Sequence, residues 1–451
     1  MYIKKLVSIF KNKEVVRRIF FTIAILFVFR IGCNITCPGI DASKLTDELS
    51  NGSNNILSMM NLLGGGALQN FSIFALGVSP YITSQIIIQL LSMDVLPALS
   101  ELNKQGQYGR KKIEMATRYL TLMLAAVQAY GIIQTAKTTE WITFTLNDNF
   151  LTYVYVVSIL VGGSMLVMWL GDQITSKGLG NGISVIIFAG IICSLPSQMS
   201  TAFSKWVLAG TATGNSVEAT KGVFTFIAYV LAYALIISFV VFIELSRRKI
   251  PVQHATRSGG SEKLSKASFL PIKINSAGVI PVIFASSILM APSVIASFIS
   301  SDAANAEWLN IFMYNKLYNT GGVMMPWGLI IYLVLVFVFT FFYANLQINP
   351  TALAENFQKN GSYIPGVKPG IETEKYVRKV LNRITLIGAL ALCAIAALPV
   401  ILTLTGVFGS DSNLALGGTG LIIVVGVALE LNNQMSGLIA GKSYDEVIGG
   451  M

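Results

Sequence analysis

Charged residues are scarce in this chain. Only 12% of its 451 residues are Asp, Glu, Lys or Arg, and 53% are hydrophobic. An average soluble protein has about 25% charged residues. This composition excludes an ordinary soluble globular domain and indicates a protein that spans the membrane several times.

Cysteine and histidine are also rare, with four Cys and one His in the whole chain. Cys33, Cys37, Cys193 and Cys393 do not form the two doublets typical of a zinc site. They lie within or beside apolar runs, so we interpret them as small buried hydrophobic side chains, with a Cys33–Cys37 disulfide as the alternative. His254 lies in a basic loop and is expected to be solvated. We therefore predict no metal and no cofactor.

Two glycine-containing motifs do not predict nucleotide binding. The stretch "GLIAGKS" would need a glycine at position 436 to form a phosphate loop, but Ser436 stands there and no strand is expected before it. The stretch "KGLGNG", with Gly178, Gly180 and Gly182, is more simply a tight turn between two helices. We therefore expect no direct nucleotide binding and no covalent chemistry, so the chain is not expected to be an enzyme.

Ten apolar segments are long enough to cross a bilayer, which requires about 20 mainly apolar residues per helix. The predicted spans are 19–36, 71–92, 119–136, 151–170, 183–202, 223–243, 276–299, 326–345, 384–405 and 416–435. The first span ends without a small-residue cleavage site, so we expect it to be retained. Five spans in each half are compatible with an inverted repeat.

Lysine and arginine, which give the chain a net charge of +10, are concentrated in alternate loops. The loops on the opposite side hold only Lys44, Lys137, Lys205, Lys221 and Lys316. The positive-inside rule therefore predicts that both termini are cytoplasmic. The predicted organisation is a basic cytoplasmic segment 1–18, an N-terminal half 19–202, an outer loop and sixth span 203–243, a basic cytoplasmic loop 244–275, two spans within 276–345, a second basic cytoplasmic loop 346–383, two spans within 384–435 and a cytoplasmic tail 436–451.

Ionisable side chains are nearly absent from the spans. Arg30 lies in the first span and Glu430 near the cytoplasmic end of the last; either residue can be structural, by snorkelling or pairing, or functional. A secondary transporter for a small solute would share ten spans and inverted halves. It would also need polar or charged groups near the midplane, so the scarcity of such groups speaks against this alternative.

Five stretches stand out in chain order: "GGALQNFSIFALGVSPYITSQIIIQLL", "MWLGDQITSKGLGNGISVIIFAGI", "INSAGVIPVIFASSI", "NPTALAENFQKNGSYIPGVKPG" and "GGTGLIIVV". Together they resemble the SecY family, the central subunit of the bacterial protein-translocation channel. The resemblance implies an all-α integral membrane protein of the bacterial plasma membrane, with ten transmembrane helices in two five-helix halves of inverted pseudo-symmetry. It also implies an hourglass pore with a plug, a ring of apolar residues at the waist and a lateral gate between the halves.

The function that this resemblance implies is translocation of unfolded secretory polypeptides. Such a channel also receives signal sequences and releases transmembrane segments sideways into membrane lipid. The driving energy would come from the SecA ATPase or a translating ribosome. SecE-like and SecG-like membrane subunits are expected beside the chain.

An interruption by three consecutive glycines precedes the second half of the second span. Non-helical backbone at membrane depth is tolerated only beside protein or a water-filled cavity, and a kinked helix docked permanently in a bundle would also satisfy this condition. The resemblance implies a plug at about 55–70, with the second half of the span following from Phe71. The plug and hinge residues would be Asn61, Leu62, Leu63, Gly64, Gly65 and Gly66.

Isoleucines recur at a spacing of one helical turn in two spans. Ile82 and Ile86 share one helix face, and Ile187 and Ile191 repeat the spacing. By periodicity alone these are ordinary core residues. The resemblance implies instead a pore ring, which we define as Ile82, Ile86, Ile187, Ile191, Ile280 and Ile423; Ile422 could replace Ile423 with a one-residue slip.

Cations in the two long basic loops match the sites where the family binds SecA and the ribosome. The resemblance assigns this role to Arg248, Lys249 and Lys368. The family usually has Arg at the position of Lys368 and Tyr at that of His254, and Lys lacks the bidentate fork of Arg. Topology and contact with anionic lipid explain most of the other loop cations.

Overall fold

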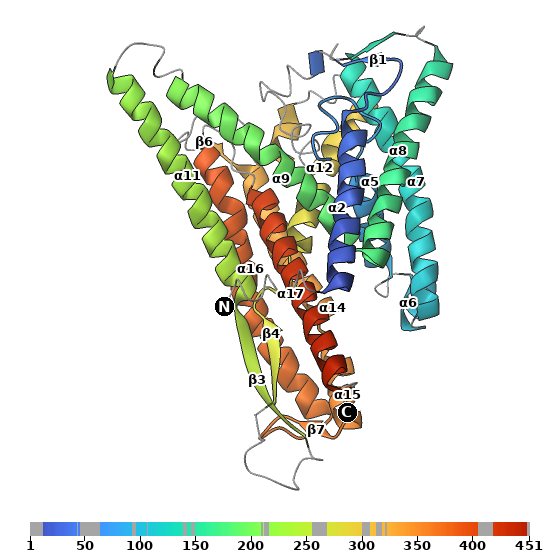
Figure 1. The fold of residues 1–451 in the computed structure, drawn as a ribbon, viewed down its shortest axis with the longest axis vertical. Helices are drawn as coiled ribbons and strands as arrows, with labels where there is room; N and C mark the ends of the chain where they lie inside the picture. The colour runs from blue at the N-terminus through green and yellow to red at the C-terminus, as the bar shows by residue number, and fades with distance from the viewer. Residues whose placement is uncertain are drawn as a thin grey trace.

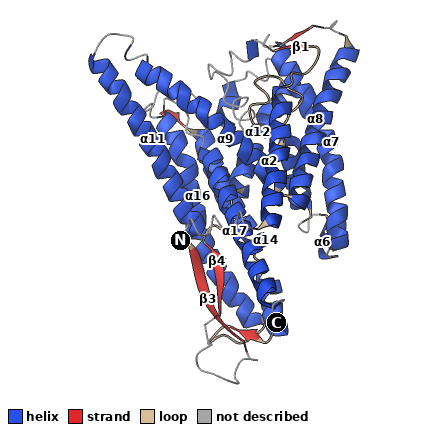
Figure 2. Ribbon diagram, viewed as in Figure 1, coloured by secondary structure: helices blue, strands red, loops and turns tan. Residues whose placement is uncertain are grey.

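The structure is a computed structural model in which helices predominate (Figure 2). It describes residues 12–42, 44–45, 64–92, 96–105, 107–138, 142–145, 149–208, 211, 216–254, 268–299, 307–312, 318–320, 323–404 and 418–448. Asn61, Leu62 and Leu63, which were predicted to belong to the plug, lie outside the described residues.

Each of the ten predicted spans overlaps one helix. These helices are α2 (Lys13–Asn34), α5 (Ser79–Leu91), α7 (Gln107–Thr138), α8 (Phe150–Lys177), α9 (Gly182–Phe203), α11 (Ser216–Leu245), α12 (Ile280–Ile299), α14 (Trp327–Gln347), α16 (Ile371–Leu404) and α17 (Gly418–Ile448). Two short helices, α6 (Pro97–Lys104) and α15 (Pro350–Lys359), precede α7 and α16. The side chains of Asn12, Asn181 and Asn349 accept hydrogen bonds from the first-turn amides of α2, α9 and α15, which explains where these helices begin.

Six of the described helical segments are long and apolar enough to cross a membrane by length and composition alone. They are Phe150–Lys177, Gly182–Leu208, Ala219–Leu245, Trp327–Lys359, Ile371–Leu402 and Gly420–Leu438. The α5 helix has 13 residues and is shorter than this criterion requires, and Ile280–Leu289 of α12 is a further, shorter apolar helical segment. The described helices therefore differ in how strongly composition alone marks them as spans.

Residues 64–78 form turns rather than a helix. The amide of Cys37 donates to the carbonyl of Phe71, and the amide of Ile73 donates to that of Ile35. The backbone of this segment therefore finds partners in the chain that follows α2. The predicted helical continuation from Phe71 is wrong, because α5 begins only at Ser79, with Pro80 in its first turn.

The helices form two groups, one around α7 and α8 and the other around α11, α14 and α16, and a central cluster of buried residues joins the two groups. Figure 1 shows α7 and α8 at one side of the molecule and α11 at the other, with α9, α12 and α17 between them. One buried cluster unites α7 with α8, and a second unites α11, α14 and α16. A third cluster joins α2, α8 and α9 to α17, so it contains residues from both halves of the chain.

The two predicted basic loops meet in a small sheet at one end of the molecule (Figure 1). Strand β3 (Arg247–His254) pairs antiparallel with β4 (Ser268–Lys273) and with β7 (Ser362–Tyr363). Ile250 and Ile272 of the hairpin pack with Ile364 and with residues of α16. Strands β1 (Ile40–Asp41) and β2 (Thr143–Phe144) pair at the opposite end, and β5 (Tyr318–Thr320) pairs with β6 (Val323–Met325).

The four cysteines are free thiols. Cys33 and Cys37 are buried, as predicted, and the alternative of a disulfide between them is wrong. Cys193 is exposed, so its predicted burial is also wrong. Its place on α9 shows that an apolar run does not specify which face of a helix is covered. Cys393 is half-buried, and its thiol donates to the carbonyl of Leu333 at 3.5 Å.

Candidate functional site

The isoleucine pair of α9 lies at the meeting point of the two groups of helices. Ile187 and Ile191 are buried in the cluster that joins α2, α8 and α9 to α17. Ile423 of α17 belongs to the same cluster. A Cβ atom built on Gly420 would lie 3.2 Å from Cγ2 of Ile191, so this part of α17 approaches α9 closely.

The isoleucine pair of α5 faces a neighbouring cluster. Ile86 is buried with Ala277, Phe284 and Tyr343, which lie before α12, on α12 and on α14. Ile82 is half-buried and packs against both this cluster and the cluster of Ile187 and Ile191. The hydroxyl of Tyr343 donates to Oε1 of Gln89 at 2.9 Å and ties α5 to α14.

The last two members of the predicted pore ring differ in their surroundings. Ile280, the first residue of α12, is 38% exposed and lies outside both clusters. Ile423 packs with α9, whereas its neighbour Ile422 is buried in the cluster of α11, α14 and α16. The structure therefore brings Ile82, Ile187, Ile191 and Ile423 into one cluster and places Ile86 beside it.

The glycine turn, residues 64–66, packs directly against α9. Gly65 has φ +71°, and a Cβ atom there would lie 3.1 Å from the Cα of Gly190 and 3.4 Å from the ring of Phe29. Gly190 stands between Ile187 and Ile191 in the sequence of α9. The guanidinium of Arg30 donates to the carbonyl of Gly65. The turn therefore lies between α2 and the part of α9 that carries two predicted ring residues.

The predicted docking residues are all exposed and lie at the end of the molecule that carries the sheet of β3, β4 and β7, here called the sheet end. Arg248 and Lys249 belong to β3, where their Cα partners are Ile272 and Pro271 of β4. Lys368 follows β7, and its carbonyl accepts a hydrogen bond from Thr373 Oγ1 at 2.9 Å. The pairing of β3 with β7 brings the two basic loops together.

The predicted tight turn at "KGLGNG" is confirmed, since it joins α8 to α9 and Gly180 has φ +81°. The amide of Leu179 donates to Thr22 Oγ1 of α2 at 3.1 Å, and that of Gly180 donates to Gln434 Oε1 of α17 at 2.8 Å. The amide of Gly182 donates to Thr175 Oγ1 at 2.8 Å. Protein oxygens thus occupy the amides that a phosphate group would need, and the turn ties α2, α8 and α17 together.

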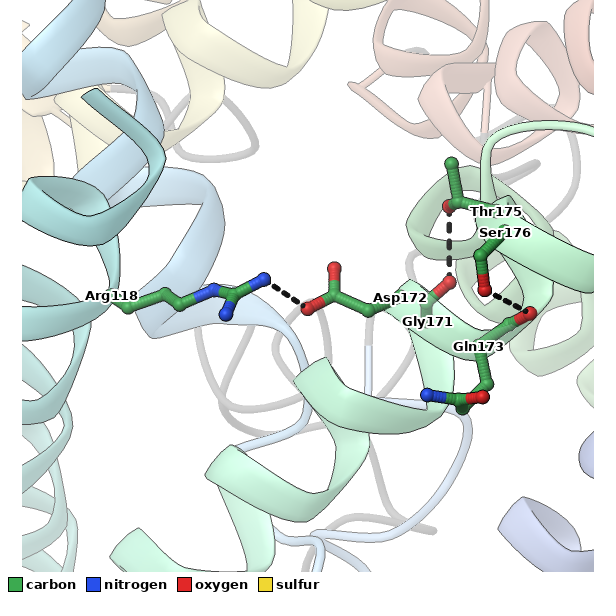
Figure 3. A network of polar contacts seen from close by, with 6 residues as sticks. All are labelled: Arg118, Gly171, Asp172, Gln173, Thr175 and Ser176. Atoms are coloured by element: carbon green, nitrogen blue, oxygen red, sulfur yellow. Dashed lines mark hydrogen bonds and ion pairs between the residues drawn. The ribbon is translucent and has the colours of Figure 1, made fainter. Parts of the chain in front are cut away.

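An ion pair near this turn joins α7 to α8 (Figure 3). Arg118 Nη2 lies 2.8 Å from Asp172 Oδ2, and both side chains are partly exposed. Thr175 Oγ1 and Ser176 Oγ of α8 donate to carbonyls of the preceding turn. Nothing in the sequence marks this pair, because its two residues are far apart in the chain and neither lies in an unusual local pattern.

The described part of the chain contains no group of three or more His, Cys, Asp or Glu that could hold a metal ion. Glu430 of α17 is exposed. Arg30 is only partly exposed and contacts the glycine turn. Of the two ionisable residues predicted near or within the spans, only Arg30 therefore touches the candidate site.

Comparisons with known proteins agree with this arrangement. A family model described as SecY matches residues 72–432. Protein translocase subunit SecY 1 of Lactobacillus kefiranofaciens subsp. kefiranofaciens is 43% identical over 437 residues, which are 96% of this chain and 97% of that relative. Protein translocase subunit SecY of Lactococcus lactis subsp. lactis is 43% identical over 446 residues, 98% of each chain.

Solved channel structures have the same fold at low sequence identity. One is a SecY protein whose plug domain stabilises the closed state of the translocation channel and maintains a membrane seal; it has a TM-score of 0.65 at 17% identity, covering 93% of this chain and 91% of that chain. Another is Sec61 in the canine ribosome-channel complex from the endoplasmic reticulum, with a TM-score of 0.59 at 17% identity and the same coverage. These likenesses confirm the predicted all-α fold of SecY type.

Proposed function

This chain belongs to the SecY family and is the pore-forming subunit of a protein-conducting channel; from that premise we propose which residues narrow the pore, seal it and bind the partners that drive transport. The family membership overrules the alternative of a small-solute transporter. Unfolded secretory polypeptides would pass between the two groups of helices, and transmembrane segments would leave sideways into lipid. In this role the chain itself performs no covalent chemistry.

The pore ring is proposed to consist of Ile82, Ile86, Ile187, Ile191, Ile280 and Ile423. The observation that carries this proposal is the single cluster in which Ile82, Ile187, Ile191 and Ile423 meet, although they come from both halves of the chain. A narrow apolar ring disfavours a continuous water column and so hinders small ions by dewetting. Isoleucine suits this task because its β-branch restricts χ1 and gives a firm rim.

The plug is proposed to comprise residues at about 55–70. The packing of Gly65 against Gly190, beside two ring residues, supports this assignment for the described end of the segment. A plug at this place would add a second seal beside the ring when no polypeptide is present. Glycine at positions 64, 65 and 66 would let the segment move, since it imposes little restraint on the backbone.

The sheet end is proposed to bind the SecA ATPase or a translating ribosome through Arg248, Lys249 and Lys368. All three cations are exposed, and the pairing of β3 with β7 places their loops side by side. Exposed cations add little to fold stability but can steer and orient a charged partner. SecE-like and SecG-like membrane subunits are proposed to complete the channel in the bacterial plasma membrane, with both termini cytoplasmic.

Conductance of the reconstituted channel complex in planar bilayers tests the ring. Replacing Ile82, Ile86, Ile187 and Ile191 together by Ser should raise the ion conductance, because hydroxyl groups allow water to wet the constriction. Deleting residues 57–66 in addition should raise it further. The matched control replaces four exposed isoleucines outside the ring, Ile23, Ile330, Ile387 and Ile401, by Ser and should leave conductance unchanged.

One outcome would show that these isoleucines are ordinary core residues. A four-serine variant that is folded and binds its partners, yet conducts no more than the parent even with residues 57–66 deleted, contradicts the ring assignment.

A further inference from the structure

Arg30 carries a charge inside the first span, and no step of transport described above uses it. It lies on α2 next to Phe29 and one turn before Cys33, both of which are buried. An ionised side chain at membrane depth is costly without polar partners. None of the ion pairs among the described residues involves Arg30. Its charge is instead directed at a backbone carbonyl, that of Gly65.

The carbonyl of Gly65 belongs to a turn in which two consecutive residues have positive φ. Gly65 and Gly66 have φ of +71° and +82°, which glycine adopts without steric cost. The Cα of Gly190 is so near that a Cβ atom on Gly65 would lie 3.1 Å from it, and a Cβ atom on Gly66 would lie 3.8 Å from Arg30 Nη1. The turn is therefore enclosed by Arg30 on one side and by the backbone of α9 on the other.

Residues 70–73, which follow the glycine turn, are held by contacts with the end of α2 and the chain after it. Asn70 Nδ2 donates to Asn34 Oδ1 at 3.4 Å. The amide of Ile73 donates to the carbonyl of Ile35 at 3.1 Å, and a bridge pairs Thr36 with Ser72. These contacts do not depend on the guanidinium of Arg30. The glycine turn can therefore leave α9 while residues 70–73 stay attached to the chain that follows α2.

We propose that Arg30 is a positioning residue that holds the glycine turn against the ring-bearing part of α9 and thereby sets the resting ion leak of the channel. This inference rests on the proposed plug. The contact is suited to reversible use, because it joins a single side chain to one backbone carbonyl. A hydrogen bond from a charged donor is also stronger than a neutral one, so a single side chain suffices to bias the position of the turn.

Resting conductance of the complete channel complex in planar bilayers, without a translocating polypeptide, measures this bias. Arg30→Ala should raise the resting conductance about tenfold, the change in population expected when a hydrogen bond from a charged donor is lost. Arg30→Lys should raise it less, because Lys keeps the charge but loses the planar fork. Arg18→Ala is the matched control on the same helix; Arg18 pairs with Glu14 at 3.0 Å and lies away from the glycine turn, so its loss should leave the conductance unchanged.

Deletion of residues 57–66 separates the positioning role from a general structural one. If Arg30 acts through the glycine turn, the deletion alone raises the leak and Arg30→Ala adds nothing further in the deleted background. Arg30→Ala that has no effect on the intact channel, or that raises the leak by the same factor in both backgrounds, overturns the inference. A deletion that does not raise the leak contradicts the proposed plug itself, so the two failures are distinguishable.

A variant at Gly65, the other residue of the contact, tests the inference if Arg30→Ala does not fold. Gly65→Ala would place a Cβ atom 3.1 Å from the Cα of Gly190 and impose φ +71° on alanine, so it should displace the turn while Arg30 is intact. The expected result is again a raised resting conductance. Gly65→Ala that folds and seals like the parent contradicts the inference.

Discussion

Glu244 is a buried carboxylate near the base of the β3–β4 hairpin. It lies at the end of α11 and is 9% exposed, and Asn275 beyond β4 is 2% exposed. Asn275 Nδ2 donates to Glu244 Oε1 at 2.6 Å and to the carbonyl of Gly278 at 3.1 Å. One amide group therefore connects the end of α11, the end of the hairpin and the start of α12.

Removing this amide should destabilise the protein. Asn275→Ala leaves the buried side chain of Glu244 without this donor, which costs about 1–3 kcal/mol. The expected result is a fall of several degrees in the thermal unfolding midpoint of the detergent-solubilised channel. Asn345→Ala is the control, because Asn345 is exposed and donates to the carbonyl of Phe341 of its own helix. An unchanged midpoint for Asn275→Ala would show that the Glu244–Asn275 contact is dispensable.

Some site residues are visible in the sequence and others are not. The i, i+4 spacing of Ile187 and Ile191 can be read directly, because it follows from helix geometry. The choice between Ile422 and Ile423 cannot, since neighbouring residues on a helix point in directions about 100° apart and only the packed partners decide between them. The partner of Arg30 is likewise hidden, because a backbone carbonyl at Gly65 leaves no trace in residue type.

At the scale of elements, long apolar runs predict the helices well and the sheet poorly. Each run contains a helix because no other open structure satisfies its backbone within lipid. The exception is α5, whose start at Ser79 depends on backbone pairing of residues 71 and 73 with the chain after α2. The β3–β7 pairing joins Gln253 to Tyr363, and contacts so distant in the chain have no local sequence signal.

The joining of the two basic loops predicts that their cations act on one partner. Charge reversal by Lys368→Glu should slow SecA-dependent translocation into vesicles by about threefold or more, because a rim charge mainly affects association. Arg248→Glu should act in the same direction and to a smaller extent. Neither change should alter thermal stability, since both side chains are exposed.

A cation of the same end that is assigned no partner provides the control. Lys379→Glu on α16 changes the net charge equally and is also exposed, so it should leave the rate near that of the parent. Translocation by purified SecA that proceeds at the parental rate in the Arg248→Glu, Lys368→Glu double variant would refute the docking assignment.

At the scale of the whole molecule, the described parts of the two basic loops lie at one end and the β1–β2 pair at the other (Figure 1). This polarity agrees with the uneven distribution of Lys and Arg in the sequence. The turn between α8 and α9 links both halves of the chain through Thr22 and Gln434. From this charge distribution the positive-inside rule predicts that the more basic end lies in the cytosol.

Labelling of single cysteines from outside the cell tests this orientation. The test uses a variant in which the four native cysteines are replaced by Ala. In this background Ser50→Cys, Ser216→Cys and Asp302→Cys should each react with an impermeant thiol reagent added to intact cells, because in the sequence these positions lie in the loops with few cations. Gln107→Cys and Ser261→Cys should react only after the membrane is permeabilised, since they belong to the basic end. Gln107 suits the purpose because it is exposed at the start of α7. Reaction of Ser261→Cys in intact cells would show that the topology is the opposite of the predicted one. Arg248 and Lys368 would then lie on the side that SecA and the ribosome cannot reach.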